Sequence, residues 1–382
     1  MEKKKIIKIT VVSFLAIIYI VLFQSFFHLL PEVSLRGVIL TGGQPRLSIK
    51  NWFNGKFQTA FESWFDSNLG LRGYFVKTDN EINYRLFDEI HQKTQQKIIV
   101  GERNNLFEKN YIDSFVGRDH KSFDELQQRV ADLKKLQDAL SERGIDFVFL
   151  VAPSKATFCP ENMPSQFLED TSEQNQIGNY DQVLPLLSIN NINYVDARYF
   201  LLEQKSSSKY PLFSKSGTHW TQYGSCLVVE KVLAEVNDKF ENNYALPDCE
   251  DIEISVTPRK EDKDLADLAN LWSARQFYQP LAYPRFDQPV FNDINLLMVG
   301  DSFSWAFLKN IFESGAVRDY NFYYYFNSDY NSQNISVPVN KDNNFLKQEI
   351  LKRNLVIVEA NDAGLGDIGF GFVSSALNAL EN

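Results

Sequence analysis

A short polar turn between two apolar runs constrains the fold of this chain more than any other segment. The run Leu296–Val299 ends at the turn Gly300–Ser304, and apolar residues resume at Trp305–Leu308. This pattern predicts a buried strand, a tight turn and a helix. Such a turn places Ser302 at the carboxyl end of a sheet, where backbone N–H groups can face an oxyanion. We therefore predict that Ser302 is a nucleophile.

The same alternation of strand and helix recurs along the chain. The predicted strands are Phe147–Val151, Tyr194–Val195, Leu296–Val299 and Leu355–Val358. The predicted helices span residues 122–142, 180–187 and 227–240. Ser122 and Glu125 have the spacing of a capping box, which marks the start of the first of these helices. Alternating elements predict an α/β fold with a mostly parallel sheet flanked by helices.

Several polar residues directly follow predicted strands, where sites of such folds gather. Lys155 is expected either to face the site or to hold a loop by a salt bridge. Glu359 and Asn361 are expected to bind substrate, to stabilise an oxyanion or to serve the structure. Asp301 is too close to Ser302 along the chain to orient a distant base, so we interpret it as an organiser of the turn.

A serine hydroxyl needs a positioned base at neutral pH, and His219 is the best candidate. It lies beside Thr218 in the polar loop 216–224, which opens a predicted helix. The chain has four histidines, and the others lie near the N-terminal apolar segment or among polar residues: His28, His91 and His120. The distance between His219 and Ser302 in the sequence is no obstacle, because such pairs are recognised by geometry.

Together these motifs resemble a known family. Gly300–Ser304 and Thr218–Thr221, followed by Tyr223 and Gly224, are similar to the paired signatures of the SGNH-hydrolase-like domain in AlgX/AlgJ-type alginate O-acetyltransferases. That family is circularly permuted, with the histidine motif before the serine motif, as in this chain. Further similar segments are Trp52–Phe57, Ile98–Gly101 with Leu106 and Phe107, Val151–Lys155 and Tyr194–Arg198. The resemblance covers residues 50–362.

The resemblance implies both a chemistry and partners. It implies an acyl-enzyme on Ser302, with His219 as base and acetyl as the acyl group. It also implies a cell-surface polysaccharide as acceptor and a multi-pass membrane O-acyltransferase that passes acetyl outward. Transfer and hydrolysis share the acyl-enzyme, so an acetylesterase stays open beside an acetyltransferase.

One position departs from the family pattern. The family has an Asp-x-His motif, whereas this chain has Gly217 in the place of the aspartate. Loss of the orienting acid can cost about 10⁴ in turnover. Three explanations remain: Asp362 or Asp367 replaces the acid, a backbone carbonyl orients His219, or the chain is a non-catalytic glycan-binding or assembly subunit.

Composition narrows the class of ligand. The net charge of −10 argues against nucleic acid as a partner and leaves a neutral or weakly charged glycan compatible.

The three cysteines, Cys159, Cys226 and Cys249, allow at most one disulfide and form no zinc motif. We interpret Cys226 as a small buried residue. No phosphate-binding glycine loop occurs, so we predict neither a cofactor nor a metal.

The N-terminus predicts a membrane anchor. Lysines precede an uncharged stretch of 22 residues, Ile9–Leu30, which is long enough to span a bilayer. The lysines should stay in the cytoplasm, so the rest of the chain would lie outside. A cleaved signal peptide is the alternative, but the apolar stretch is too long for a normal one. The expected organisation is a tail (1–8), an anchor (9–30), a helical lead-in (31–95) and the SGNH-hydrolase-like domain (96–382).

Two aromatic segments each have two interpretations. An aromatic stripe at Trp52, Phe57, Phe61, Trp64 and Phe65 has helical spacing, so it either packs against the main domain or contacts a membrane surface or partner. The tract 315–338 contains Phe322–Phe326, which fits a further strand. Exposed aromatic rings with amide side chains are also typical of sugar-binding surfaces.

Overall fold

The computed structural model describes residues 2–37, 43–91, 97–169 and 178–381. The chain divides into two compact units. Unit 1 comprises Met1–Lys97 with Ala266–Ala274, and unit 2 comprises Ile98–Leu265 with Arg275–Asn382. The expected boundary between lead-in and domain, at residues 95 and 96, lies outside the described residues.

Unit 2 is built on a seven-stranded sheet in the order β10-β9-β8-β7-β11-β3-β4. The strands are β3 (Asp146–Ala152), β4 (Tyr194–Asp196), β7 (Asn295–Gly300), β8 (Asp319–Tyr324), β9 (Ser328–Asn331), β10 (Ser336–Pro338) and β11 (Leu355–Asn361). The pairs from β4 to β8 are parallel, and β9 and β10 extend the sheet in antiparallel fashion. The predicted mostly parallel α/β fold is confirmed.

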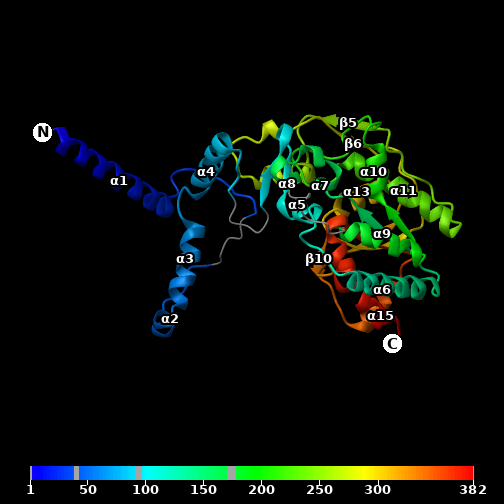
Figure 1. Cartoon of the computed structure of the whole chain (residues 1–382). Helices are drawn as coiled ribbons and strands as arrows, with labels where there is room; N and C mark the ends of the chain where they lie inside the picture. Colours follow the sequence, from blue (N-terminus) through cyan, green and yellow to red (C-terminus); the bar gives the residue numbers. More distant parts are fainter. Residues whose placement is uncertain (1, 38–42, 92–96, 170–177, 382) are drawn as a thin grey trace. The chain divides into compact units, whose positions relative to one another are not determined.

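Helices cover both faces of this sheet (Figure 1). One face packs against α10 (Ala197–Gln204), α11 (Gln222–Phe240) and α13 (Ser304–Glu313), and the other against α6 (Phe123–Ser141), α9 (Asn179–Ile189), α14 (Asn343–Leu351) and α15 (Phe372–Glu381). Alternate residues of one strand enter different cores: Leu296 and Met298 belong to the first, Leu297 and Val299 to the second. Burial on both faces explains why the central strands are continuous apolar runs.

Local signals set the helix ends. The capping box of Ser122 and Glu125 is present at the start of α6, as predicted. Helix α11 begins at Gln222, five residues before the predicted Leu227, because the Thr221 side chain caps it by accepting a hydrogen bond from Gly224 N–H. Several shorter helices complete the unit: α5 (Lys109–Phe115), α7 (Lys155–Phe158), α8 (Ser165–Glu169) and α12 (Asp264–Leu268), whose last residues belong to unit 1.

The aromatic tract forms a hairpin rather than one strand. Strand β8 ends at Tyr324, and Tyr325 and Phe326 form the turn to β9 with φ angles of 49° and 50°. Such angles suit glycine or asparagine, so two consecutive aromatic residues there are strained. The prediction of a strand through Phe326 is therefore wrong at its last two residues.

Two small antiparallel sheets and a disulfide lie beside the main sheet. The small sheets pair β1 (Ile98–Val100) with β2 (Leu106–Glu108), and β5 (Ile252–Ser255) with β6 (Leu281–Pro284). A disulfide joins Cys226 to Cys249, while Cys159 is a free thiol. Cys226 is buried as predicted, but it is also cross-linked.

Besides the end of α12, the described residues of unit 1 form the helices α1 (Glu2–Phe27), α2 (Ile49–Phe53), α3 (Lys56–Asn68) and α4 (Arg72–Phe87). Within α1, Lys4–Phe27 is long and apolar enough to cross a membrane. The helix stops three residues before the predicted end at Leu30. The Gln24 side chain bonds both backbone groups of Leu30, which replaces helical hydrogen bonds just before Pro31.

Candidate active site

Ser302 lies in the turn between β7 and α13, as the sequence predicts. The turn passes directly over Glu359 of the neighbouring strand β11, because a Cβ at Gly300 would lie only 2.5 Å from Glu359 Oε2. A side chain at the last residue of β7 would therefore displace the Glu359 carboxyl group. Asp301 Oδ1 accepts a hydrogen bond from Phe303 N–H at 2.8 Å, which fixes the turn around the serine.

Two buried acids, Asp301 and Glu359, hold the turn by hydrogen bonds. Glu359 Oε2 accepts hydrogen bonds from Asp301 N–H (2.9 Å) and from the Ser304 hydroxyl (2.8 Å). Asp301 Oδ2 accepts from the Asn361 backbone N–H (3.1 Å) and side-chain amide. Burial, aided by the nearby Asp301 charge, raises the pKa of Glu359 well above its ordinary value. Glu359 and Asn361 thus bind the serine turn itself.

His219 contacts Ser302 directly. The distance from His219 Nε2 to Ser302 Oγ is 2.8 Å. The neighbouring indole N–H of Trp220 donates to Phe303 O at 3.1 Å, and the rings of His219 and Phe303 meet edge to face with centroids 4.8 Å apart. His219 and Trp220 of the histidine loop therefore contact Ser302 and Phe303 of the serine turn, and these contacts hold the imidazole beside the hydroxyl.

Asp264 occupies the other side of the imidazole, and sequence reasoning missed it. Its Oδ2 lies 2.8 Å from His219 Nδ1. Its Oδ1 accepts from the backbone N–H groups of Thr218 (3.0 Å) and Leu265 (2.6 Å). Asp264 is thus held against the ring by the backbone on both sides.

The loop that bears Asp264 fills the space left by Gly217. A Cβ at Gly217 would lie 2.6 Å from Glu261 O and 2.9 Å from Asp262 C. The hydroxyls of Ser214 and Ser216 both donate to Asp262 O, at 2.6 and 2.7 Å. The missing side chain at position 217 therefore lets another segment approach and supply the carboxylate.

The two acids proposed from the sequence lie elsewhere. Asp362 accepts hydrogen bonds from Ser154 N–H (3.0 Å) and from the Thr157 hydroxyl. Its Oδ2 also lies 3.7 Å from Arg198 Nη1. Asp367 pairs with Arg129 at 3.1 Å. Both suggestions for the orienting acid are wrong, and so is the alternative of a backbone carbonyl, because a carboxylate occupies that position.

Lys155 holds the histidine loop from inside. Its ammonium donates to Lys215 O and Gly217 O, each at 3.0 Å, and it lies over the Phe107 ring. The side chain is buried, and burial lowers the pKa of Lys155 to about 7. Of the two predicted roles, loop support is the observed one, but through backbone carbonyls instead of a salt bridge.

The charge balance around His219 favours its protonated form. Burial lowers the pKa of the imidazole, but the Asp264 carboxylate, with smaller effects from Asp301 and Glu108, outweighs burial and raises the pKa above 6.5. The side chain is 9% exposed, so these charges act with little screening by water. An imidazolium formed during a reaction would therefore be stabilised.

Tyr325 is the second residue that sequence reasoning missed. Its backbone N–H donates to Gly300 O at 2.9 Å, which ties the strained hairpin to the serine turn. Its ring packs against Tyr324 and Phe370. Burial and the Asp301 charge raise the pKa of Tyr325, whereas a hydrogen bond with Ser302 opposes this. Its hydroxyl is thus a neutral donor close to the serine.

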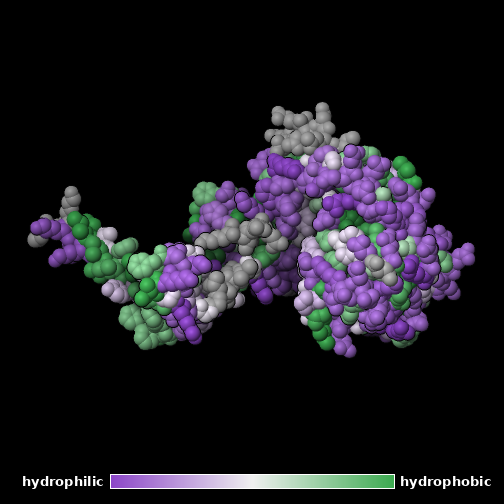
Figure 2. Space-filling view, turned by 90° about the horizontal axis from the view of Figure 1, so that it is seen from below, coloured by the Kyte–Doolittle hydropathy of each residue, from purple (hydrophilic) through white to green (hydrophobic). Residues whose placement is uncertain are grey.

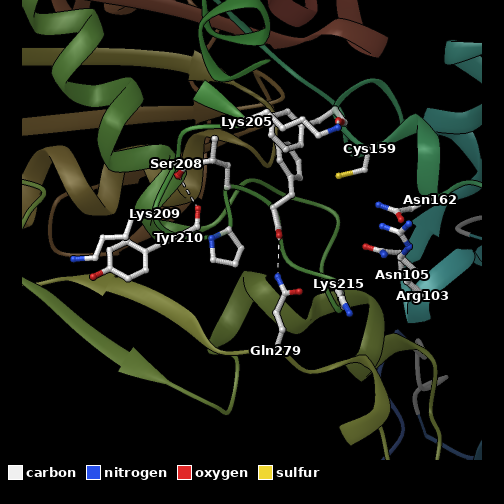
Figure 3. Close-up of a pocket in the computed structure, with 14 residues that line it drawn as sticks. Arg103, Asn105, Cys159, Asn162, Lys205, Ser208, Lys209, Tyr210, Lys215 and Gln279 are labelled. Atoms are coloured by element: carbon white, nitrogen blue, oxygen red, sulfur yellow. Dashed lines mark hydrogen bonds between the residues drawn. The ribbon is translucent and has the colours of Figure 1, made fainter. Parts of the chain in front are cut away.

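A cavity of about 510 Å³ lies beside the segment that leads into the histidine loop (Figure 3). Phe213 and Lys215, just before the loop, line this cavity, whereas Ser302 and His219 do not. Its other polar lining residues include Arg103, Lys205, Lys209, Asn105, Asn162 and Gln279. In the part of the chain that the structure describes, His, Cys, Asp and Glu side chains form no group of three or more that could hold a metal ion.

Fold and site together define an α/β protein with a serine, a histidine and an acid in contact at the carboxyl end of a parallel sheet. A family model described as the SGNH hydrolase-like domain of the acetyltransferase AlgX matches residues 98–325. The chain belongs to this family, which confirms the resemblance drawn from its motifs.

Individual relatives are distant. The probable alginate O-acetylase AlgJ of Pseudomonas aeruginosa is 23% identical over 185 residues, and that of Azotobacter vinelandii is 22% identical over 187; each match covers 48% of this chain and 44% of the relative. The chain therefore matches less than half the length of these relatives. Among solved structures, the O-acetyltransferase domain of Pseudomonas putida AlgJ (16% identity, 75% of this chain, all of that chain) has a TM-score of 0.45, and Bacillus cereus PatB1 (12%, 71% and 97%) one of 0.46.

Proposed function

We propose that this chain is a membrane-anchored, extracytoplasmic O-acetyltransferase that modifies a cell-surface polysaccharide through an acyl-enzyme on Ser302. The observation behind this proposal is the continuous line of contacts from Ser302 Oγ through His219 to Asp264. The idea of a non-catalytic subunit arose from the absence of a carboxylate at position 217, and Asp264 removes that reason.

In the first half of the reaction, Ser302 Oγ attacks the carbonyl carbon of an acetyl donor. His219 Nε2 takes the serine proton, and Asp264 stabilises the imidazolium. The tetrahedral intermediate then collapses: the bond to the donor group breaks, the leaving group takes the proton from His219, and acetyl stays on Ser302.

In the second half, a sugar hydroxyl attacks the acetyl-Ser302 ester. His219 takes the proton of this hydroxyl and returns it to Ser302 Oγ as the ester bond to the enzyme breaks. The product is the O-acetylated sugar, and the enzyme is restored. Water in place of the sugar gives hydrolysis, so exclusion of water decides between transfer and esterase activity.

The Ser302 backbone N–H is the turn amide best placed to stabilise the oxyanion. The N–H of Phe303 is already bonded to Asp301, whereas the Ser302 N–H donates to no acceptor among the described residues. The neutral Tyr325 hydroxyl is a second donor near Ser302. Donors that face the developing charge typically contribute a factor of about 10²–10³ each.

Two features support a location outside the cytoplasm. Helix α1 is long and apolar enough to anchor the chain, and its neighbouring lysines would remain inside. The disulfide between Cys226 and Cys249 is typical of oxidising compartments. A partner on the membrane that brings acetyl from the cytoplasm, such as a multi-pass O-acyltransferase, fits this placement.

The cavity lined by Phe213 and Lys215 has side chains that can bind part of a polysaccharide chain. Its amides can meet sugar hydroxyls, its aromatic residues can stack on sugar faces, and its cations would suit carboxylates. The relatives named above are associated with alginate by name, but for this chain we propose only that the acceptor is a cell-surface polysaccharide.

The acyl-enzyme is the direct test of this function. Full-length protein in detergent is incubated with para-nitrophenyl acetate and quenched in acid during turnover. Intact mass spectrometry should show one added acetyl group, and peptide mapping should place it on Ser302, because this hydroxyl contacts the His219 imidazole. Protein unfolded in denaturant before addition is the control. Acetylation only at surface lysines, equal in both samples, would contradict the proposal.

The pH dependence should follow His219. Only the neutral imidazole can accept a proton, so kcat/KM for ester hydrolysis should fall as pH decreases through a pKa raised above 6.5. In Asp264→Asn the carboxylate is gone while burial remains, so the inflection should move to lower pH. A pH–rate profile of both proteins measures the shift, and an unchanged inflection would show that Asp264 does not act on His219.

A further inference from the structure

Helices α2 and α3 of unit 1 present a ladder of aromatic rings. Ring centroids lie 5.8 Å apart for Trp52 and Phe57, 5.7 Å for Phe57 and Phe61, and 5.6 Å for Phe61 and Trp64. Phe65 continues the ladder at 6.1 Å from Phe61. The four residues of the ladder after Trp52 lie on one side of α3, because residues three and four apart share a helix face.

This face is only partly covered by protein. No residue of α2 or α3 is buried: Trp52 is 50% exposed, Phe61 36% and Phe65 37%, while Phe57 and Trp64 are half-buried. Figure 2 shows hydrophobic residues open to solvent at the α1 end of the chain, whereas the face of unit 2 in this view is predominantly hydrophilic. Contiguous exposed apolar surface of this kind marks contact with a membrane or another molecule.

The end of α1 fixes where α3 lies. Gly70, just after α3, donates its backbone N–H to Ser25 Oγ at 2.7 Å. A Cβ at Gly70 would lie 2.5 Å from Ser25 N and 2.7 Å from Val21 O, so the chain passes directly against the last turns of α1. If α1 crosses a bilayer, these turns are where it leaves the hydrocarbon core, and α3 ends at that level.

We propose that the aromatic face of α2 and α3 lies in the lipid–water interface of the membrane that α1 crosses. This inference rests on the anchoring role proposed above for α1. Trp and Phe side chains prefer the headgroup level, and an amphipathic helix there buries its apolar face at the acyl boundary. Lys50 and Lys56 are exposed and can extend toward headgroups, while Thr59, Ser63 and Asp66 lie on the opposite face of α3.

This arrangement would affect how the catalytic unit meets an acetyl donor in the membrane. Unit 2 is joined through the chain to unit 1, which holds both the anchor and this interfacial helix. A donor that delivers acetyl at the membrane would then meet the catalytic unit within a limited distance, which raises its effective concentration.

Site-specific quenching in nanodiscs tests the proposal. The full chain, with Cys159→Ser to remove the free thiol, receives a single cysteine by Phe61→Cys, Thr59→Cys or Ile17→Cys, each labelled with the fluorophore NBD. Thr59 is the matched control, because it lies about 200° around the helix from Phe61. Phe53→Cys provides a second probe at a side chain that is not packed. Quenching is measured with aqueous iodide and with phosphatidylcholine that carries a doxyl group near the headgroup.

Labels at positions 61 and 53 should be quenched by the doxyl lipid, and their iodide quenching constants should be about one third or less of that at position 59. Equal iodide quenching at 59 and 61 would overturn the proposal. Protection of position 61 from iodide without lipid quenching would also overturn it, because protein would then cover the face. Iodide quenching at position 17 as strong as at position 59 would instead contradict the anchor, on which both proposals depend, because position 17 lies in the middle of the span Lys4–Phe27.

Discussion

Ser302→Ala should lower kcat/KM for ester hydrolysis by a factor of about 10⁴ or more, because the nucleophile cannot be replaced by a neighbour. The next hydroxyl along the chain, Ser304, is buried and donates to Glu359. Residual activity should come only from binding and from donors that stabilise the oxyanion. Initial rates with para-nitrophenyl acetate measure the loss.

His219→Ala should cause a loss of similar size, and the double variant should be no slower than either single one. Groups that act as a unit in proton transfer show this non-additivity. Ser374→Ala and His91→Ala are matched controls, since both side chains are exposed and far from the turn in sequence. If the controls lose as much activity as Ser302→Ala, or if Ser302→Ala retains full activity, the proposed mechanism is wrong.

The fold could be predicted because its signals are local. Strands of the central sheet are buried on both faces, so they appear in the sequence as short continuous apolar runs. The turn after β7 and the cap at Ser122 are also encoded within a few residues. These features depend only on neighbouring residues, so the fold class could be predicted. The strand order depends on contacts between distant segments, so it could not.

The site was only partly predictable for the same reason. Ser302 and His219 each lie in a recognisable local context, but Asp264 follows no strand and has no motif spacing to either. Its position depends on how closely two loops approach, and that depends on Gly217 having no side chain. The one available signal was the glycine itself, which indicated a missing acid without indicating its replacement.

Tyr325 was missed because its role contradicts its sequence pattern. An aromatic run predicts a strand, whereas Tyr325 and Phe326 adopt a left-handed conformation in a turn. Such strain persists only when surrounding contacts impose it, and it is often found at functional sites. Here the contacts include Gly300 O and the ring of Phe370.

Asp264→Asn should lower kcat by about 10³–10⁴ with little change in KM, because it disturbs the imidazole and not substrate binding. The backbone N–H groups of Thr218 and Leu265 hold the side-chain oxygen, so the new amide NH₂ would face His219 Nδ1. A donor at that position favours the tautomer with its proton on Nε2, which cannot accept the Ser302 proton. Steady-state kinetics measure the effect, with the exposed Asp248→Asn as control.

Adding Gly217→Asp to Asp264→Asn should not restore activity, although it recreates the Asp-x-His spacing of the family. A Cβ at position 217 would collide with the backbone at Glu261 O and Asp262 C, which cannot rotate away as a side chain can. The double variant should therefore be no faster than Asp264→Asn and less stable in thermal unfolding. Recovery of kcat to within about tenfold of the wild type would show that the loops adjust, and that the acid is interchangeable between the two positions.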